Sequence, residues 1–248
     1  IMKVNILKLI LKKAIYYFKR AADQNDHRAQ LALGVIYHLS YFVPHDINKA
    51  IHYYSLSANQ NNDCAQYNLG IIYYDGNYVK RDIKKSIHYF TLSANLNNDD
   101  AQFILGYLYY KGKYVERDIN KTIYYLNLLC KKNNTQAQLL VGEIYYKGKY
   151  VQYDINKVIH YFTLAAKSND KRAQYMLGFI YYSNFLYEPK SNIKKSIYWF
   201  TQSVKNDCIQ ADFALGFLFH EQNKITEAIK YYKEGSSFND QYAKNNLG

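Results

Sequence analysis

The sequence has little of what builds collagen-like, glycine-rich or disulfide-stapled proteins. Its 248 residues include only two prolines, eleven glycines and three cysteines. So few prolines and glycines exclude collagen-like and low-complexity linker chains. The cysteines, Cys64, Cys130 and Cys208, are odd in number and lie far apart, with no CxxC or Cys-His spacing. They predict neither a disulfide framework nor a zinc site, so we expect a reducing compartment, the cytoplasm.

Long hydrophobic runs and acidic residues are also scarce. Lys or Asn interrupts every apolar stretch before it reaches the ~18–20 residues that a membrane-spanning helix needs. The chain has 20 Asp and Glu against 32 Lys and Arg, a formal net charge of +12. Hydrophobic residues nevertheless make up 49% of the sequence and aromatic residues 17%, including 30 Tyr. This apolar content is enough for a packed core and excludes intrinsic disorder.

A repeat of about 36 residues dominates the chain. A Leu-Gly or Val-Gly pair recurs seven times, at intervals of 36, 36, 36, 36, 38 and 32 residues, and an alanine lies five residues before each glycine. A period of ~20–50 residues is typical of solenoids, propellers and arrays. The seven glycines are Gly34, Gly70, Gly106, Gly142, Gly178, Gly216 and Gly248.

Each repeat predicts two helices. Ala65, Leu69 and Ile72 have the i, i+4, i+7 spacing of one helix face, and residues 83–94 continue such a stripe in a second helix. Strand-like alternation is absent from the sequence. We therefore expect an all-α solenoid formed by a single array over residues 1–248, with about seven ~36-residue helix-turn-helix repeats. The units cover residues 26–61, 62–97, 98–133, 134–169, 170–207 and 208–239, with partial units at 1–25 and 240–248.

Caps and glycines define the ends and crossings of these helices. Asn62 and Asp82 stand where a side-chain oxygen can accept backbone N–H groups of a first turn. Gly76 is placed to end a first helix in a left-handed conformation. Gly70 lies in mid-helix, where glycine costs ~1 kcal/mol relative to alanine, so we expect it at a close helix crossing. The Tyr73 column, three residues later, is the expected filler of the gap.

The unit resembles the Sel1-like repeat, a relative of the tetratricopeptide repeat. Residues 65–76 read Ala-Gln-Tyr-Asn-Leu-Gly-Ile-Ile-Tyr-Tyr-Asp-Gly, and residues 49–54 also follow the family pattern. The resemblance covers residues 10–248 and implies a right-handed α/α superhelix that acts as an adaptor for protein partners. One departure recurs, because the family's second loop glycine is tyrosine at Tyr78, Tyr114 and Tyr150. Loop-borne contacts of the family are therefore not carried over.

One face of the first helices is the expected binding surface. Its positions vary from unit to unit and have the spacing i, i+4, i+7, i+11, which places them on one side of a helix. First helices line the concave surface of tetratricopeptide-like arrays, and the centre of this face is apolar and aromatic, which suits a bound helix or extended peptide. The alternative is that these residues pack against the next repeat. The fifteen candidates are Asn68, Ile71, Asp75, Asp100, Ile104, Tyr107, Lys111, Gln136, Leu140, Glu143, Lys147, Arg172, Met176, Phe179 and Phe217.

The sequence thus predicts a non-catalytic protein-interaction scaffold with no cofactor and no metal site. A second hypothesis is a basic-surface module for nucleic acid or an anionic membrane. It depends on a repeating lysine column, but no RNA-binding motif accompanies that column, and we expect no nucleic-acid partner. The column is Lys13, Lys49, Lys85, Lys121, Lys157 and Lys195.

A third hypothesis is a hydrolase, the activity proposed for some bacterial relatives of the family. The sequence offers no catalytic motif or convergent set of titratable groups in its support.

The ends of the chain are a separate question. Residue 1 is Ile, and neither end has a clearly polar capping helix, so we expect flanking segments or self-association.

Overall fold

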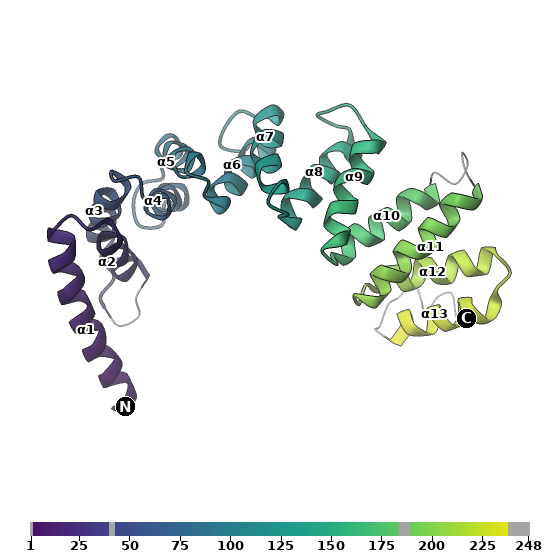
Figure 1. Cartoon of the computed structure of the whole chain (residues 1–248), viewed down its shortest axis with the longest axis horizontal. Coiled ribbons are helices and arrows are strands. Elements are labelled where there is room, and N and C mark those ends of the chain that lie inside the picture. Colours follow the sequence, from purple (N-terminus) through teal and green to yellow (C-terminus); the bar gives the residue numbers. More distant parts are fainter. Residues whose placement is uncertain (1, 40–42, 184–188, 238–248) are drawn as a thin grey trace. The chain divides into compact units, whose positions relative to one another are not determined.

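The computed structural model describes residues 2–39, 43–183 and 189–237. Within these ranges every regular element is a helix, which confirms the all-α prediction (Figure 1). The predicted partial unit 240–248 lies outside the described residues. The helices are α1 (Met2–Asp23), α2 (His27–Leu39), α3 (Ile47–Ala58), α4 (Asp63–Asp75), α5 (Ile83–Asn95), α6 (Asp99–Lys111), α7 (Ile119–Cys130), α8 (Thr135–Lys147), α9 (Ile155–Lys167), α10 (Lys171–Ser183), α11 (Pro189–Lys205), α12 (Ile209–Glu221) and α13 (Ile225–Ser237).

The helices form hairpins that stack within two compact units, residues 1–125 and residues 126–248. In the N-terminal unit α2 packs on α3 and α4 on α5, and each hairpin contacts the next through α3 and α4 and through α5 and α6. In the C-terminal unit α8 packs on α9, α10 on α11 and α12 on α13. Two-helix repeats that contact their neighbours in sequence are the defining feature of an α-solenoid, so the predicted architecture is confirmed.

The helix ends follow the predicted chemistry. Asn62 Oδ1 accepts the backbone N–H of Ala65 at 2.9 Å, and Asp82 Oδ1 accepts that of Lys85 at 3.0 Å. Gly76 ends α4 with φ at 68°, in the left-handed region that side chains disfavour. The turn before each first helix was not foreseen: an Asn or Asp recurs there with positive φ, for example 57° at Asn61. Asn and Asp tolerate this conformation better than other residues that have a side chain.

Five of the predicted mid-helix glycines, Gly34, Gly70, Gly142, Gly178 and Gly216, lie at close crossings as predicted, but the predicted filler was wrong. A Cβ on Gly70 would lie 2.6 Å from Cδ1 and Cε1 of Phe90, a ring of the second helix of the same hairpin. Tyr73 instead stacks on Tyr89, with ring centroids 5.9 Å apart. The missing side chain therefore admits the aromatic residue twenty positions later, and this ring is fully buried.

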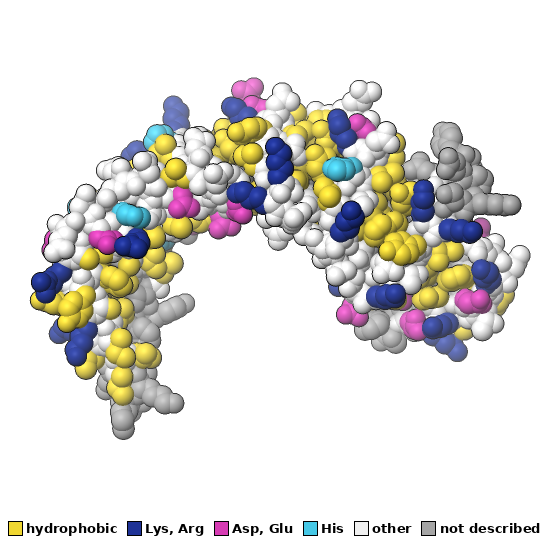
Figure 2. Space-filling view, viewed as in Figure 1, with side chains coloured by type: hydrophobic (Ala, Val, Ile, Leu, Met, Phe, Trp, Pro, Cys, Tyr) yellow, Lys and Arg dark blue, Asp and Glu magenta, His cyan; other side chains and the backbone are white. Residues whose placement is uncertain are grey.

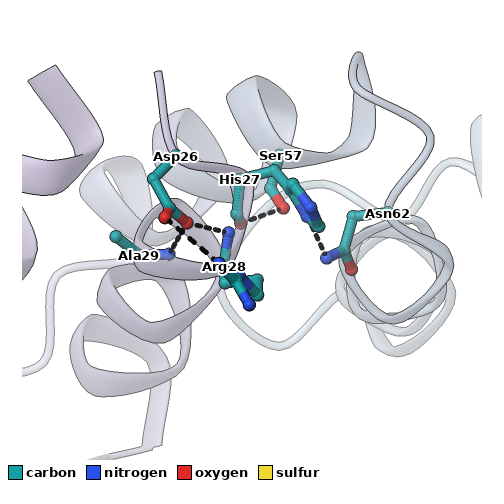
Figure 3. Close-up of polar contacts among 6 residues, drawn as sticks. All are labelled: Asp26, His27, Arg28, Ala29, Ser57 and Asn62. Atoms are coloured by element: carbon teal, nitrogen blue, oxygen red, sulfur yellow. Dashed lines mark hydrogen bonds and ion pairs between the residues drawn. The ribbon is translucent and has the colours of Figure 1, made fainter. Parts of the chain in front are cut away.

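Buried serines join the two helices of a hairpin. In the first hairpin Ser57 Oγ of α3 donates to the carbonyl of His27 in α2 at 2.7 Å, and Asn62 Nδ2, at the start of the next hairpin, lies 3.0 Å from His27 Nδ1 (Figure 3). The same figure shows Asp26 capping α2. In the next repeat Ser93 makes the equivalent bond to the carbonyl of Asp63 at 2.8 Å. The serine bonds give acceptors to the buried hydroxyls and tie the second helix of each hairpin to the first turn of its first helix.

Candidate functional site

The fifteen candidate residues lie on the first helices of successive repeats, α4, α6, α8, α10 and α12. None of them is buried, and we call the side of these helices that carries them, taken in each unit separately, the first-helix face. Six are half-buried, namely Asn68, Ile71, Ile104, Leu140, Glu143 and Met176. Nine are exposed, namely Asp75, Asp100, Tyr107, Lys111, Gln136, Lys147, Arg172, Phe179 and Phe217.

Part of the first-helix face contributes to packing between repeats. Ile71 and Ile104 pack against the buried cluster that includes Phe90, and Met176 packs against the cluster that includes Phe162. Each of these apolar side chains packs between repeats and also keeps some exposed surface, so it could contact a partner as well. Their assignment to a binding surface remains a prediction.

Large apolar side chains of the same face are exposed at one register position. Tyr107, Phe179 and Phe217 occupy that position in α6, α10 and α12, with exposed fractions of 42%, 40% and 37%. In α2 the position holds Val35, which is 37% exposed. Aromatic side chains that lie open on a rigid helix are typical anchors of protein interfaces. Figure 2 shows apolar side chains at the surface of both units.

The repeating lysine column has a role inside the hairpin. Lys85 Nζ lies 5.1 Å from the ring centroid of Tyr73, and Lys157 Nζ lies 4.7 Å from that of Tyr145. Lys157 also pairs with Asp154, the cap of its own helix, at 3.4 Å. The backbone N–H of Lys157 is the main cause of a lowered pKa at Asp154. These lysines therefore help to close each hairpin, although their side chains stay in contact with solvent.

On the face shown in Figure 2, Lys and Arg side chains are spread over both units, and acidic side chains lie among them. Within the described ranges, no group of three or more His, Cys, Asp or Glu side chains is placed to hold a metal ion. A search of the same residues found no helix with the length and hydropathy needed to cross a membrane.

A buried glutamine column is the feature that sequence reasoning missed. Gln66 and Gln102 each donate from Nε2 to the carbonyl of the residue eight positions earlier, Ala58 and Ala94, at 3.2 and 3.1 Å. The signal available in the sequence was a polar residue repeated in a column next to the core alanine. In the repeat of α12 this position is Asp212, whose pKa burial raises to about 6.

The fold and this surface define a class, the helix-turn-helix repeat proteins of the α-solenoid type. The Sel1 repeat model matches residues 11–26, 27–62, 65–98, 99–134, 135–170 and 171–208. The chain therefore belongs to the Sel1 repeat family, whose members generally act as protein-interaction scaffolds. The comparison with curated proteins found no match.

Two solved structures are similar to the chain over nearly its whole length. One is c5321, a protective antigen of uropathogenic Escherichia coli with the same repeat fold, at 25% identity and a TM-score of 0.78. The match covers 94% of this chain and 50% of the E. coli chain, so the present sequence spans half of that protein's length. The other is a Sel1 repeat protein of Oxalobacter formigenes, at 26% identity, a TM-score of 0.64, and coverage of 95% and 98%.

Proposed function

We propose that this chain is a non-catalytic scaffold that binds a peptide or helix of a protein partner along the first-helix face. The observation that carries the proposal is the exposed column of Tyr107, Phe179 and Phe217. The core columns of the same helices repeat almost unchanged, because stacking requires them to. Exposed aromatic residues have no such requirement in the folded chain, and they lose little conformational entropy when a partner covers them.

The titratable groups of the described residues support a non-catalytic role. Asp26, Asp46, Asp118 and Asp154 have a lowered pKa because each accepts hydrogen bonds at a helix N-terminus, a structural task. The carboxyl of Asp212 has a raised pKa because it is buried, with only 4% of the residue exposed. A catalytic site needs such groups to converge on a substrate.

Affinity purification with paired variants tests the proposal. The Tyr107→Ala/Phe179→Ala variant removes two exposed anchors of the first-helix face. The control Tyr124→Ala/Tyr198→Ala removes two tyrosines of second helices, which are 60% and 55% exposed. We expect both variants to keep the unfolding midpoint of the wild type, and only the first to lose proteins captured by the wild type and identified by mass spectrometry.

Two results would contradict the proposal. Equal capture by the wild type and both variants would remove the binding role from this face. A lowered unfolding midpoint in the Tyr107→Ala/Phe179→Ala variant would instead assign these side chains to packing between repeats.

A further inference from the structure

A pocket of about 290 Å³ lies in the N-terminal unit, between α4 and α6 and beside the loop that follows α6. We call it the Tyr107 pocket, and its lining residues are Tyr74, Tyr107, Leu108, Lys111, Lys113 and Tyr114. Tyr74 and Tyr114 meet edge to face, with ring centroids 5.7 Å apart. Pockets for small-molecule ligands measure about 300–1,000 Å³, so this volume suits one large side chain of a bound peptide.

Cations lie against the aromatic rings of the pocket. Lys111 Nζ lies 5.1 Å from the centroid of the Tyr107 ring, and Lys113 Nζ lies 5.0 Å from that of Tyr114. Arg81 adds a guanidinium 5.3 Å from the Tyr114 ring, and its Nη1 lies 3.4 Å from the Tyr114 hydroxyl. A hydrogen bond with Lys113, followed by the charges of both cations, lowers the pKa of Tyr114. The rings hold the cations in place beside an apolar opening.

The combination of aromatic ring and cations belongs to this repeat. At the equivalent positions one repeat earlier, Ile71 stands for Tyr107, Asp75 for Lys111 and Asn77 for Lys113.

One repeat later, Lys147, Lys149 and Tyr150 keep the positions of Lys111, Lys113 and Tyr114, and Lys149 Nζ lies 5.2 Å from the Tyr150 ring centroid. Glu143, however, stands for Tyr107 and pairs with Lys147 at 3.1 Å. Stacking of repeats therefore does not require an aromatic ring at the position of Tyr107, since both neighbouring repeats fold without one. Residues that depart from the repeat at the surface are candidates for recognition of a ligand.

We propose that the Tyr107 pocket binds an acidic peptide segment of a protein partner, an inference that rests on the proposed scaffold function. An apolar side chain of the peptide enters between Tyr74 and Tyr107, and carboxylates on either side of it pair with Lys111, Lys113 and Arg81. Such pairs are charge-assisted hydrogen bonds, stronger than neutral ones. The net charge of +12 attracts acidic segments to the chain before contact.

Acidic neighbours favour a short peptide over a nucleic acid. Asp75 and Asp100 are exposed on the first helices of this unit, and exposed Glu116 follows Lys113 in the loop. A polyanion that follows the helices would meet these carboxylates and be repelled. A peptide of a few residues needs only the pocket and the cations at its rim.

Fluorescence anisotropy with the full chain tests the inference. The probe is a fluorescein-labelled peptide with a central phenylalanine between runs of glutamate, and its matched probe has glutamine in place of glutamate. We expect the acidic probe to bind, and the Lys111→Glu/Lys113→Glu variant to weaken binding about tenfold or more. Tyr107→Ala should weaken binding as well. Higher ionic strength should also weaken it, because salt screens exposed charges.

The control is Lys131→Glu/Lys132→Glu, the same change of charge at two exposed lysines outside the first-helix face. It should leave the affinity for the acidic probe unchanged, and circular dichroism should give every variant the unfolding midpoint of the wild type. Equal weakening by both double variants would overturn the inference in favour of attraction by net charge. Equal binding of the glutamine probe would overturn it as well.

Two further outcomes separate this inference from the proposed function. A labelled oligouridylate that binds through Lys111 and Lys113, while the acidic peptide does not, would assign the pocket to nucleic acid and overturn the inference. An acidic probe that fails to bind, in a chain whose partner capture still depends on Tyr107 and Phe179, would overturn the inference and leave the scaffold function standing. Failure of both assays would overturn both.

Discussion

Asp212 occupies a position where five other repeats have glutamine. Gln174, one repeat earlier, donates from Nε2 to the carbonyl of Ala166 at 3.2 Å. The carbonyl at the equivalent place for Asp212 belongs to Val204. A carboxylate cannot donate a hydrogen bond, and Asp212 is only 4% exposed, with Oδ1 lacking a hydrogen-bond partner. The ionised side chain is therefore expected to destabilise the repeat of α12 and α13.

The size of this effect follows from the pKa. Burial, with smaller contributions from the charges of Glu234 and Asp207, raises the pKa of Asp212 from 3.8 to about 6. Because the folded-state pKa is the higher one, protonation stabilises the fold. That stabilisation is complete below about pH 3.8 and is lost as the pH rises through about 6. At about 1.4 kcal/mol per pKa unit, ionisation costs about 3 kcal/mol at pH ~7.5 and about 1 kcal/mol at pH ~4.5.

Asp212→Asn keeps the shape of the side chain and removes its charge. We expect the gain in unfolding free energy over the wild type to be about 2 kcal/mol larger at pH ~7.5 than at pH ~4.5. Urea unfolding followed by far-UV circular dichroism measures this gain at each pH. Amide hydrogen exchange in α12 and α13 gives a local measure, since repeat arrays also unfold repeat by repeat.

Gln174→Asp provides the matched control. It places the same carboxyl in the repeat of α10, where it should lower stability, and lower it more at pH ~7.5 than at pH ~4.5. The reasoning would be refuted if Asp212→Asn changed the free energy of unfolding equally at both pH values, because the carboxyl would then not titrate in its buried position.

Three other predictions follow from the packing, the caps and the thiols. Gly178→Ala should destabilise the fold by about 1–3 kcal/mol, because the added Cβ would lie 2.5 Å from the facing aromatic ring. Gly142→Ala should destabilise it by less, because there the distance is 3.0 Å. Urea unfolding measures the cost of both variants. Asn98→Ala should cost about 1 kcal/mol by removing the cap of α6, whereas Asn98→Ser, which keeps a capping oxygen without adding a charge beside Asp63, should cost less. Cys64 is exposed and should react with iodoacetamide in the native chain, as mass spectrometry can show. Burial raises the pKa of Cys130 to about 12, so it should react only after unfolding.

Each of these predictions has a result that would contradict it. Equal costs for the two glycine variants would mean that the rings move aside freely. A serine at position 98 that costs as much as alanine would contradict the capping role of the side-chain oxygen. Alkylation of Cys130 at the same rate as Cys64 in the native chain would show that its hairpin opens readily.

The period, the hairpins and the helix ends could be predicted because each leaves a local trace in the sequence. Asn62, Gly76 and Asp82 act through residues within a few positions of themselves. The partner of Gly70 could not be predicted in the same way. Tyr73 and Phe90 are both aromatic and both lie within reach along the chain, and only the crossing angle of α4 and α5 decides which ring fills the gap.

In the candidate site, too, the sequence predicts which residues share a helix face but not how exposed each one is. Spacing places Ile71 and Tyr107 at one register position of a helix face, and the structure keeps both accessible. The extent of exposure was not predictable, because it depends on how much of each side chain the next repeat covers. Ile71 is half-buried against the cluster of Phe90, whereas Tyr107 is 42% exposed. The tyrosine partners of the lysine column could not be predicted for a related reason: they lie on the other helix of the hairpin, twelve residues away for Lys85 and Tyr73.

Departures from the repeat have different consequences in the core and at the surface. Lys85 recurs because it contacts Tyr73 across the hairpin, so its charge is explained by folding and is not evidence for a ligand. Asp212 breaks a buried column, and the break is expected to reduce stability above its pKa. Tyr107 breaks the pattern at the surface, where Ile71 and Glu143 stand at its position in the neighbouring repeats. The fold does not require this aromatic ring, and its place among cations supports the proposal of an acidic peptide ligand.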